Sequence, residues 1–151
     1  MVKTRAIAFV NRFGEKRTGG NARLSWHPGG KYTLPVAGRD HIQGHVGAPV
    51  ALLEYGDFEC PVCGEVHPVV KVIQDRLGDE LCFAYRHFPI TSVHPHSAHA
   101  AEAADAARAQ GRFWAMHDLL YENQDALEDE DLAQYAVALG LDARRPMTSH
   151  K

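Results

Sequence analysis

Two cysteines, Cys60 and Cys63, stand two residues apart in the stretch YGDFECPVCGEVHP, which covers residues 55–68. Paired thiols at this spacing can exchange a disulfide, supply half of a metal site, or pack as small buried side chains. Disulfide exchange needs a thiolate, and the dipole and free N–H groups at a helix N-terminus favour one. The choice among these roles depends on the elements that carry the two cysteines.

A short buried strand is predicted on each side of the cysteine motif. The run VALLEY at 50–55 is apolar and bounded by Pro49 and Gly56, which is typical of a buried strand. The run LCFAYRHFP at 81–89 combines aromatic and apolar residues and predicts a second strand. Because a helix of crossover length is predicted between them, the two strands are expected to be parallel and joined by a right-handed connection.

The helix between these strands is predicted to begin at the cysteine motif and to end before Gly78. Cys60 is placed like an N-cap residue, and Pro61 occupies the first helical position, where proline is favoured. Apolar residues then recur at helical spacing, and Pro68 predicts a kink. Cys60 therefore has the position of an attacking thiol. Cys63 lies one turn further along, close enough to attack a mixed disulfide, and is predicted to be the mostly buried resolving thiol.

Three more helices are predicted after the second strand. Each segment carries apolar residues at helical spacing, and the first is rich in alanine. The acidic stretch at 128–131 is expected to begin the last helix, because negative charge interacts favourably with the helix dipole there. The predicted helices cover 97–110, 112–124 and 129–140.

These patterns divide the chain into four parts. The N-terminal part is rich in Gly, Arg and Lys and shows no sustained period, although its run TRAIAFV is compatible with an edge strand or a solvated arm. The predicted parts are an extension at 1–35, a strand-helix-strand unit at 36–96, a helical subdomain at 97–142 and an irregular tail at 143–151.

The composition is typical of one soluble globular domain, with 151 residues of which 45% are hydrophobic and 23% charged. A formal net charge of -3 gives no general attraction to nucleic acid or to an anionic membrane surface, so neither is expected as a partner. We predict no signal peptide, and no run reaches the roughly 18 apolar residues of a spanning helix. We therefore expect no membrane insertion and a cytoplasmic location. In that compartment three cysteines indicate redox catalysis or metal binding before structural disulfides.

A zinc site is the main alternative to a redox pair. A structural zinc site needs four closely spaced ligands, and the sequence has no second CxxC motif. A CxxC beside a strand-helix pattern favours redox chemistry, so we predict no metal site, and inert thiols are the third alternative. The histidines considered as zinc ligands are His67, His87, His94, His96 and His99.

Four other residues near the motif are interpreted from their surroundings. Glu54 stands in an apolar strand, where burial of its carboxyl group would suggest a function, although strand alternation could instead turn it to solvent. Asp57 and Glu59 flank the motif and are expected to be solvated, with charges that oppose the thiolate and shift the couple toward reduction. Cys82 is expected to be a buried strand residue without a catalytic role.

The chain resembles the DsbA-like branch of the thioredoxin superfamily from about Val36 to Asp142. The resemblance is carried by RDHIQG, ALLEYGDFECPVC, FAYRHFPITSVHPHS and ALGLD. Two spacings match besides CPVC, an acidic residue six positions before Cys60, which is Glu54, and a proline eight positions after it, which is Pro68. The resemblance implies an α/β, thioredoxin-like fold with an inserted α-helical subdomain.

The resemblance also implies a thiol-disulfide oxidoreductase. Cys60 would attack, Cys63 would resolve the mixed disulfide, and Glu54 would accept or relay a proton. The implied partners are protein or small-molecule thiols and disulfides together with a redox partner, and no bound cofactor is required. A cytoplasmic location favours a reductase or an isomerase. The residues expected to neighbour the site are Pro61, Val62 and Pro68.

The sequence departs from the family pattern near its C-terminus. The family continues after the inserted helices with a cis-proline loop facing the CxxC, two strands and a closing helix, whereas this sequence ends in DARRPMTSHK. Pro146 is not assigned the cis-proline role. We expect a truncated or frame-shifted reading frame that lacks the C-terminal strands, and exposed strand edges then predict dimerisation or aggregation. A zinc-stabilised interaction module and a non-catalytic remnant stay open as alternative functions.

Overall fold

A computed structural model of the protein describes residues 7–12 and 40–142. Most of the predicted N-terminal extension lies outside the described residues, as do the tail at 143–151 and Pro146. The described residues form two compact units. The first, here called the sheet unit, comprises the described residues up to 55 together with 69–86, and the second, here called the helical unit, comprises 56–68 and 87–142.

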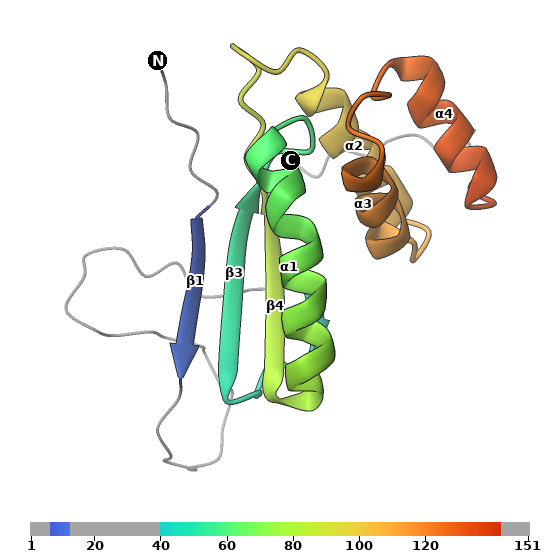
Figure 1. Ribbon diagram of the computed structural model, residues 1–151. Helices are drawn as coiled ribbons and strands as arrows, with labels where there is room; N and C mark the ends of the chain where they lie inside the picture. Colours follow the sequence, from blue (N-terminus) through green and yellow to red (C-terminus); the bar gives the residue numbers. More distant parts are fainter. Residues whose placement is uncertain (1–6, 13–39, 143–151) are drawn as a thin grey trace. The chain divides into compact units, whose positions relative to one another are not determined.

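The sheet has four strands in the order β1-β3-β4-β2 (Figure 1). β1 (Ile7–Arg12) pairs antiparallel with β3 (Val50–Gly56), and β2 (His41–Gly44) pairs antiparallel with β4 (Leu81–His87). β1 and β2 therefore form the edges of the sheet as it is described. Of the run TRAIAFV, the described part from Ile7 onward lies in β1, so the structure adopts the edge-strand alternative there.

β3 and β4 are the parallel strands that the sequence predicts. They are neighbours in the sheet and run in the same direction (Figure 1). Just beyond the last residues of β4, the Phe88 backbone N–H donates a hydrogen bond of 2.8 Å to the carbonyl oxygen of Gly56, the last residue of β3. The C-terminal ends of the two strands therefore lie together, as expected for a strand-helix-strand unit.

Burial along β3 and β4 follows their central positions. In β3 the buried side chains of Leu52 and Glu54 share one face, which is the two-residue alternation of a strand. β4 buries its first five residues, a pattern typical of a strand that is covered on both faces. Cys82 lies in this run and is fully buried, as predicted.

The short strand β2 was not predicted, and its pairing depends on a glycine. Gly44 has a positive φ of 85°, and a Cβ atom there would lie 2.2 Å from the backbone oxygen of Leu81. Only glycine fits this close approach without moving the backbone. Just before β2, the buried carboxylate of Asp40 accepts hydrogen bonds of 2.5 and 2.8 Å from Nε and Nη2 of Arg86 in β4. This bidentate pair fixes the segment against the neighbouring strand.

Helix α1 (Pro61–Leu77) has the bounds that the sequence predicts. Pro61 occupies its first position, and Gly78, with a φ of 47°, begins the 3-10 turn η1 (Gly78–Glu80) that leads into β4. Pro68 lies within α1 and is exposed. The first part of α1, up to Pro68, belongs to the helical unit and the remainder to the sheet unit.

Three helices pack together in the helical unit. They are α2 (Ser97–Arg108), α3 (Phe113–Glu122) and α4 (Asp129–Ala138), and each lies within two residues of its predicted bounds. α2 buries Ala100, Ala104 and Ala107, and these small side chains allow α3 and α4 to pack closely against it. The acidic stretch at 128–131 begins α4 as expected.

Candidate active site

The two cysteines of the CPVC motif lie at the N-terminus of α1. The backbone oxygen of Cys60 accepts a hydrogen bond of 3.1 Å from the N–H of Gly64, so Cys60 directly precedes the first turn. Cys63 lies within that turn, which contains no acidic side chain. Both cysteines are buried, with 1% and 2% of their surfaces exposed. Between them Pro61 and Val62 are exposed, so this dipeptide is the accessible part of the motif.

Asp57 fixes the turn that leads into Cys60. Its Oδ1 accepts a hydrogen bond of 2.9 Å from the Glu59 N–H, while Oδ2 accepts bonds of 2.8 Å from the Ile90 N–H and from Nδ1 of His94. The Asp57 side chain is buried, so the expectation that it is solvated is wrong. These three donors supply the hydrogen bonds that water gives to an exposed carboxylate and that a buried one would otherwise lack.

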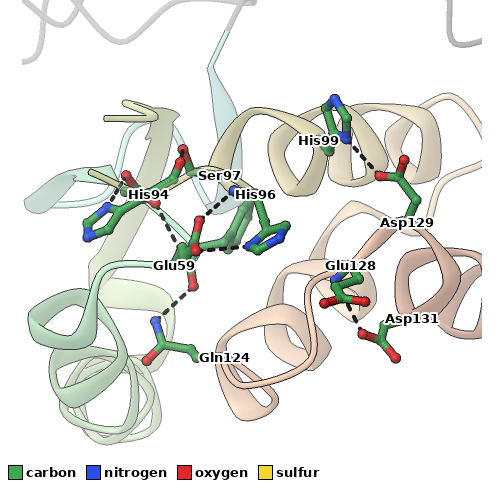
Figure 2. A network of polar contacts seen from close by, with 11 residues as sticks. Glu59, His94, His96, Ser97, His99, Gln124, Glu128, Asp129 and Asp131 are labelled. Carbon is green, nitrogen blue, oxygen red and sulfur yellow. Dashed lines mark hydrogen bonds and ion pairs between the residues drawn. The ribbon is translucent and has the colours of Figure 1, made fainter. Parts of the chain in front are cut away.

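Glu59 makes a second link between the turn and the segment before α2. Its Oε2 accepts a hydrogen bond of 2.7 Å from the backbone N–H of His96, and its Oε1 lies 3.0 Å from Nδ1 of the same residue (Figure 2). The expectation of a solvated side chain is wrong here too, since the Glu59 side chain is only 18% exposed. The predicted shift toward reduction rests on negative charge beside the thiolate rather than on its solvation, and it stays a prediction.

Gln124, which follows α3, makes a third link to the same turn. Its Nε2 donates hydrogen bonds of 2.8 and 2.9 Å to the carbonyl oxygens of Phe58 and Cys60. A Cβ atom at Gly64 would lie 2.1 Å from Oε1 of Gln124, so the glycine leaves room for this amide. Sequence reasoning did not find Gln124, because it lies 64 residues after Cys60 and no local pattern marks it.

The histidines considered as zinc ligands lie in separate places. His94 and His96 contact Asp57 and Glu59, and His99 forms an exposed pair with Asp129 at 2.7 Å (Figure 2). His67 lies in α1 near two residues of α3, and His87 lies 3.6 Å from Asp105. Among the described residues, the groups with three or more potential metal ligands include no cysteine.

Glu54 is buried in β3 of the sheet unit, with 2% of its surface exposed. Burial removes solvent from the carboxylate and raises the pKa of Glu54 from 4.5 to about 7. In the part of the chain that the structure describes, its Oε1 has no hydrogen-bond partner. Of the two orientations left open for Glu54, the buried one is observed. Burial also raises the pKa of the Cys82 thiol.

Comparison with protein families identifies the class. A family model described as thioredoxin matches residues 37–148, and the chain therefore belongs to the thioredoxin family. Within the described residues, no helix has the length and apolar character needed to cross a membrane.

Solved structures narrow the fold to the DsbA-like type. A thioredoxin-like oxidoreductase from Silicibacter pomeroyi DSS-3 aligns with a TM-score of 0.64 and 28% identity, covering 70% of this chain and 60% of that one. The thiol-disulfide exchange protein alpha-DsbA2 from Wolbachia pipientis aligns with a TM-score of 0.62 and 18% identity, covering 70% and 55%. The second likeness concerns the fold alone. The chain therefore has the predicted DsbA-like thioredoxin fold.

Curated relatives with higher identity are much longer than this chain. The Na(+)/H(+) antiporter NhaA 1 from Mycolicibacterium gilvum is 47% identical over 104 residues, covering 69% of this chain and 17% of the relative. The Na(+)/H(+) antiporter NhaA 3 from Salinispora tropica is 50% identical over 109 residues, covering 71% and 16%. The chain thus spans about one sixth of the length of these relatives.

Proposed function

We propose that the protein is a thiol-disulfide oxidoreductase in which Cys60 is the nucleophile and Cys63 the resolving thiol. The observation that carries the proposal is the place of Cys60, at the N-terminus of α1 after a turn held by Asp57, Glu59 and Gln124. A helix N-terminus favours a thiolate, and hydrogen bonds on successive residues of the turn restrict its backbone. Membership of the thioredoxin family supports the same class of reaction.

The exchange proceeds in two balanced steps. The Cys60 thiolate attacks one sulfur of a substrate disulfide, a new S–S bond forms, and the other substrate sulfur leaves as a thiolate. Cys63 loses its proton and attacks the Cys60 sulfur, which releases the second substrate sulfur and forms the Cys60–Cys63 disulfide. The substrate gains two electrons and, after protonation, two protons. A thiol-bearing redox partner reverses these steps and returns the dithiol.

Glu54 is proposed as the group that accepts or returns a proton. Its pKa of about 7 means that both protonation states are populated near neutral pH, which is the condition for efficient proton exchange. The support for this role is the chemistry of its own buried environment together with its position six residues before Cys60.

Access to the nucleophile is part of the proposal. Because Cys60 is 1% exposed, the residues around its sulfur must move before a substrate disulfide can reach it. The exposed Pro61 and Val62 are the proposed first contact for a substrate, and Pro68 is exposed further along α1. Protein or small-molecule thiols and disulfides are the proposed substrates. The cytoplasmic location, the preference for reduction or isomerisation, and dimerisation stay predictions.

Trapping of a mixed disulfide tests the assignment of the two cysteines. In a Cys82→Ser background, the Cys63→Ser variant should react with oxidised glutathione at Cys60 and keep the adduct, because no resolving thiol remains. The matched Cys60→Ser variant should gain the adduct much more slowly at the buried Cys63. Intact mass spectrometry over time measures both rates. Equal rates in the two variants, or a Cys63→Ser rate no higher than in urea-unfolded chain, would reject the proposal in favour of a non-catalytic protein.

A further inference from the structure

A second group of chemically active side chains lies in the helical unit apart from the cysteines. It consists of His67 from the first part of α1 and of His117 and Asp118 from α3. The two histidines are 7% and 3% exposed, which is unusual for a residue type of intermediate burial. The Asp118 side chain is 29% exposed and is the most accessible of the three. Disulfide exchange as proposed above uses none of these residues.

The three side chains converge at one carboxylate oxygen. Oδ1 of Asp118 lies 3.0 Å from Nδ1 of His117 and 3.7 Å from Nε2 of His67. A tetrahedral zinc ion with bonds of about 2.0–2.2 Å separates its nitrogen and oxygen ligands by roughly 3.3–3.5 Å. The two distances from Oδ1 of Asp118 lie on either side of this value, and one ligand atom from each of the three residues lies within 4.8 Å of the others.

Neighbouring aromatic rings hold the two imidazoles in place. The His67 ring stacks on Tyr121, with centroids 5.1 Å apart and an interplanar angle of 24°. The His117 ring meets Phe58, Trp114 and Tyr121 at centroid distances of 5.6, 5.1 and 5.0 Å. Both rings therefore have little freedom to lose when a ligand binds. Preorganised side chains of this kind are what a metal site requires.

We infer that His67, His117 and Asp118 form a binding site for a divalent transition-metal ion, with zinc as the best match. Two imidazoles and one carboxylate suit zinc and other borderline ions better than magnesium or calcium, which prefer all-oxygen ligands. The partly exposed Asp118 leaves a side from which an ion and a water ligand can enter. Bound metal would join α1, four residues after Cys63, to α3. This site departs from the sequence-based prediction of no metal, which considered His67 but neither His117 nor Asp118.

Cobalt(II) is a suitable probe because its spectrum reports the ligand type. The full-length chain with reduced thiols should bind one equivalent of Co²⁺, showing visible d–d absorption of tetrahedral or five-coordinate intensity without a thiolate-to-metal charge-transfer band. One equivalent of Zn²⁺ should displace it. His67→Gln and Asp118→Asn should each weaken binding by more than about tenfold, since even residues that only orient ligands contribute about 10–100-fold. These two variants avoid the more deeply buried His117.

The chain offers a matched control in the exposed pair of His99 and Asp129. His99→Gln removes an imidazole next to a carboxylate elsewhere in the helical unit and should leave the affinity and spectrum unchanged. Urea unfolding of each variant verifies that it is folded at the titration temperature. Absence of stoichiometric Co²⁺ binding, a thiolate charge-transfer band, or binding that survives both His67→Gln and Asp118→Asn would overturn the inference. The first outcome would mean that the three residues only contribute ring packing and electrostatic contacts between α1 and α3.

Discussion

Glu54 is the residue whose protonation responds most directly to its surroundings. It is a buried carboxyl group in an apolar strand, and burial raises its pKa to about 7. The folded state therefore holds a proton on Glu54 at pH values at which the unfolded chain has already released it. By linkage, the free energy of unfolding falls as the pH rises from 4.5 through about 7.

Replacing Glu54 with glutamine should remove this pH dependence. A shift from 4.5 to about 7 corresponds to about 3 kcal/mol of stability that the wild-type protein has at low pH and lacks above pH 8. We expect Glu54→Gln to be similar to wild type in stability at pH 4.5 and more stable by about that amount at pH 8. Urea unfolding at several pH values between these limits measures the difference between the two proteins.

Glu65 provides the control for this prediction. It is exposed on α1, so Glu65→Gln should leave the pH profile of stability parallel to that of wild type. A Glu54→Gln profile that also runs parallel to wild type would show that burial of Glu54 does not perturb its titration. The proton-exchange role proposed for Glu54 would then lose its support.

At the residue level, the sequence was informative where local spacing carries the signal. The CPVC motif and Cys82 could be placed because each stands in or beside a short apolar run with clear turn residues at its ends, whereas the orientation of Glu54 was left open. Asp57 was misjudged, because an acidic residue beside a glycine resembles a solvated turn residue. Its burial depends on donors from Ile90 and His94, which are more than 30 residues away.

At the element scale, the start of α1 depends on how closely the side chain of Gln124 packs against Gly64. Nε2 of Gln124 satisfies two carbonyl oxygens of the turn before α1, and Oε1 occupies the space beside Gly64. A methyl group at position 64 would force the Gln124 side chain away from both carbonyl groups. The cost of that substitution should therefore depend on whether Gln124 is present.

A double-mutant cycle tests this dependence. Gly64→Ala should destabilise the wild-type protein, because displacing the amide loses hydrogen bonds whose unsatisfied groups cost about 1–3 kcal/mol. In the Gln124→Ala background the same change should be neutral or stabilising, since alanine favours a helix over glycine by about 1 kcal/mol. Urea unfolding of the four proteins gives the coupling free energy. Additive effects would show that the two residues do not share this space, and Asp75→Ala at an exposed position of α1 is the control.

The elements themselves were largely predictable, for reasons that particular residues make clear. β3, α1 and β4 follow from apolar runs bounded by Pro49, Gly56 and Gly78, and the three later helices follow from helical periodicity. β2 was missed because its four residues, HIQG, contain a single large apolar side chain, which is too little to mark a strand. Its formation rests on pairing with β4 and on the absence of a side chain at Gly44, neither of which a local pattern reveals.

At the scale of the whole molecule, the fold and the function are supported by different observations. The DsbA-like thioredoxin fold follows from the family match and from solved structures that this chain covers by 55–60%. The activity depends on whether this chain alone holds Cys60 and Cys63 as an exchangeable pair. Relatives of which the matched segment makes up about one sixth do not answer that question.

The redox equilibrium of the chain with glutathione tests this central claim most directly. A Cys82→Ser protein is equilibrated in buffers of graded ratios of reduced to oxidised glutathione, and alkylation followed by mass spectrometry counts the free thiols. We expect a single two-electron transition between dithiol and Cys60–Cys63 disulfide, reached faster than in the urea-unfolded chain. Glutathione adducts without an intramolecular disulfide, or a transition no faster than in the unfolded chain, would contradict the assignment of this protein as a thiol-disulfide oxidoreductase.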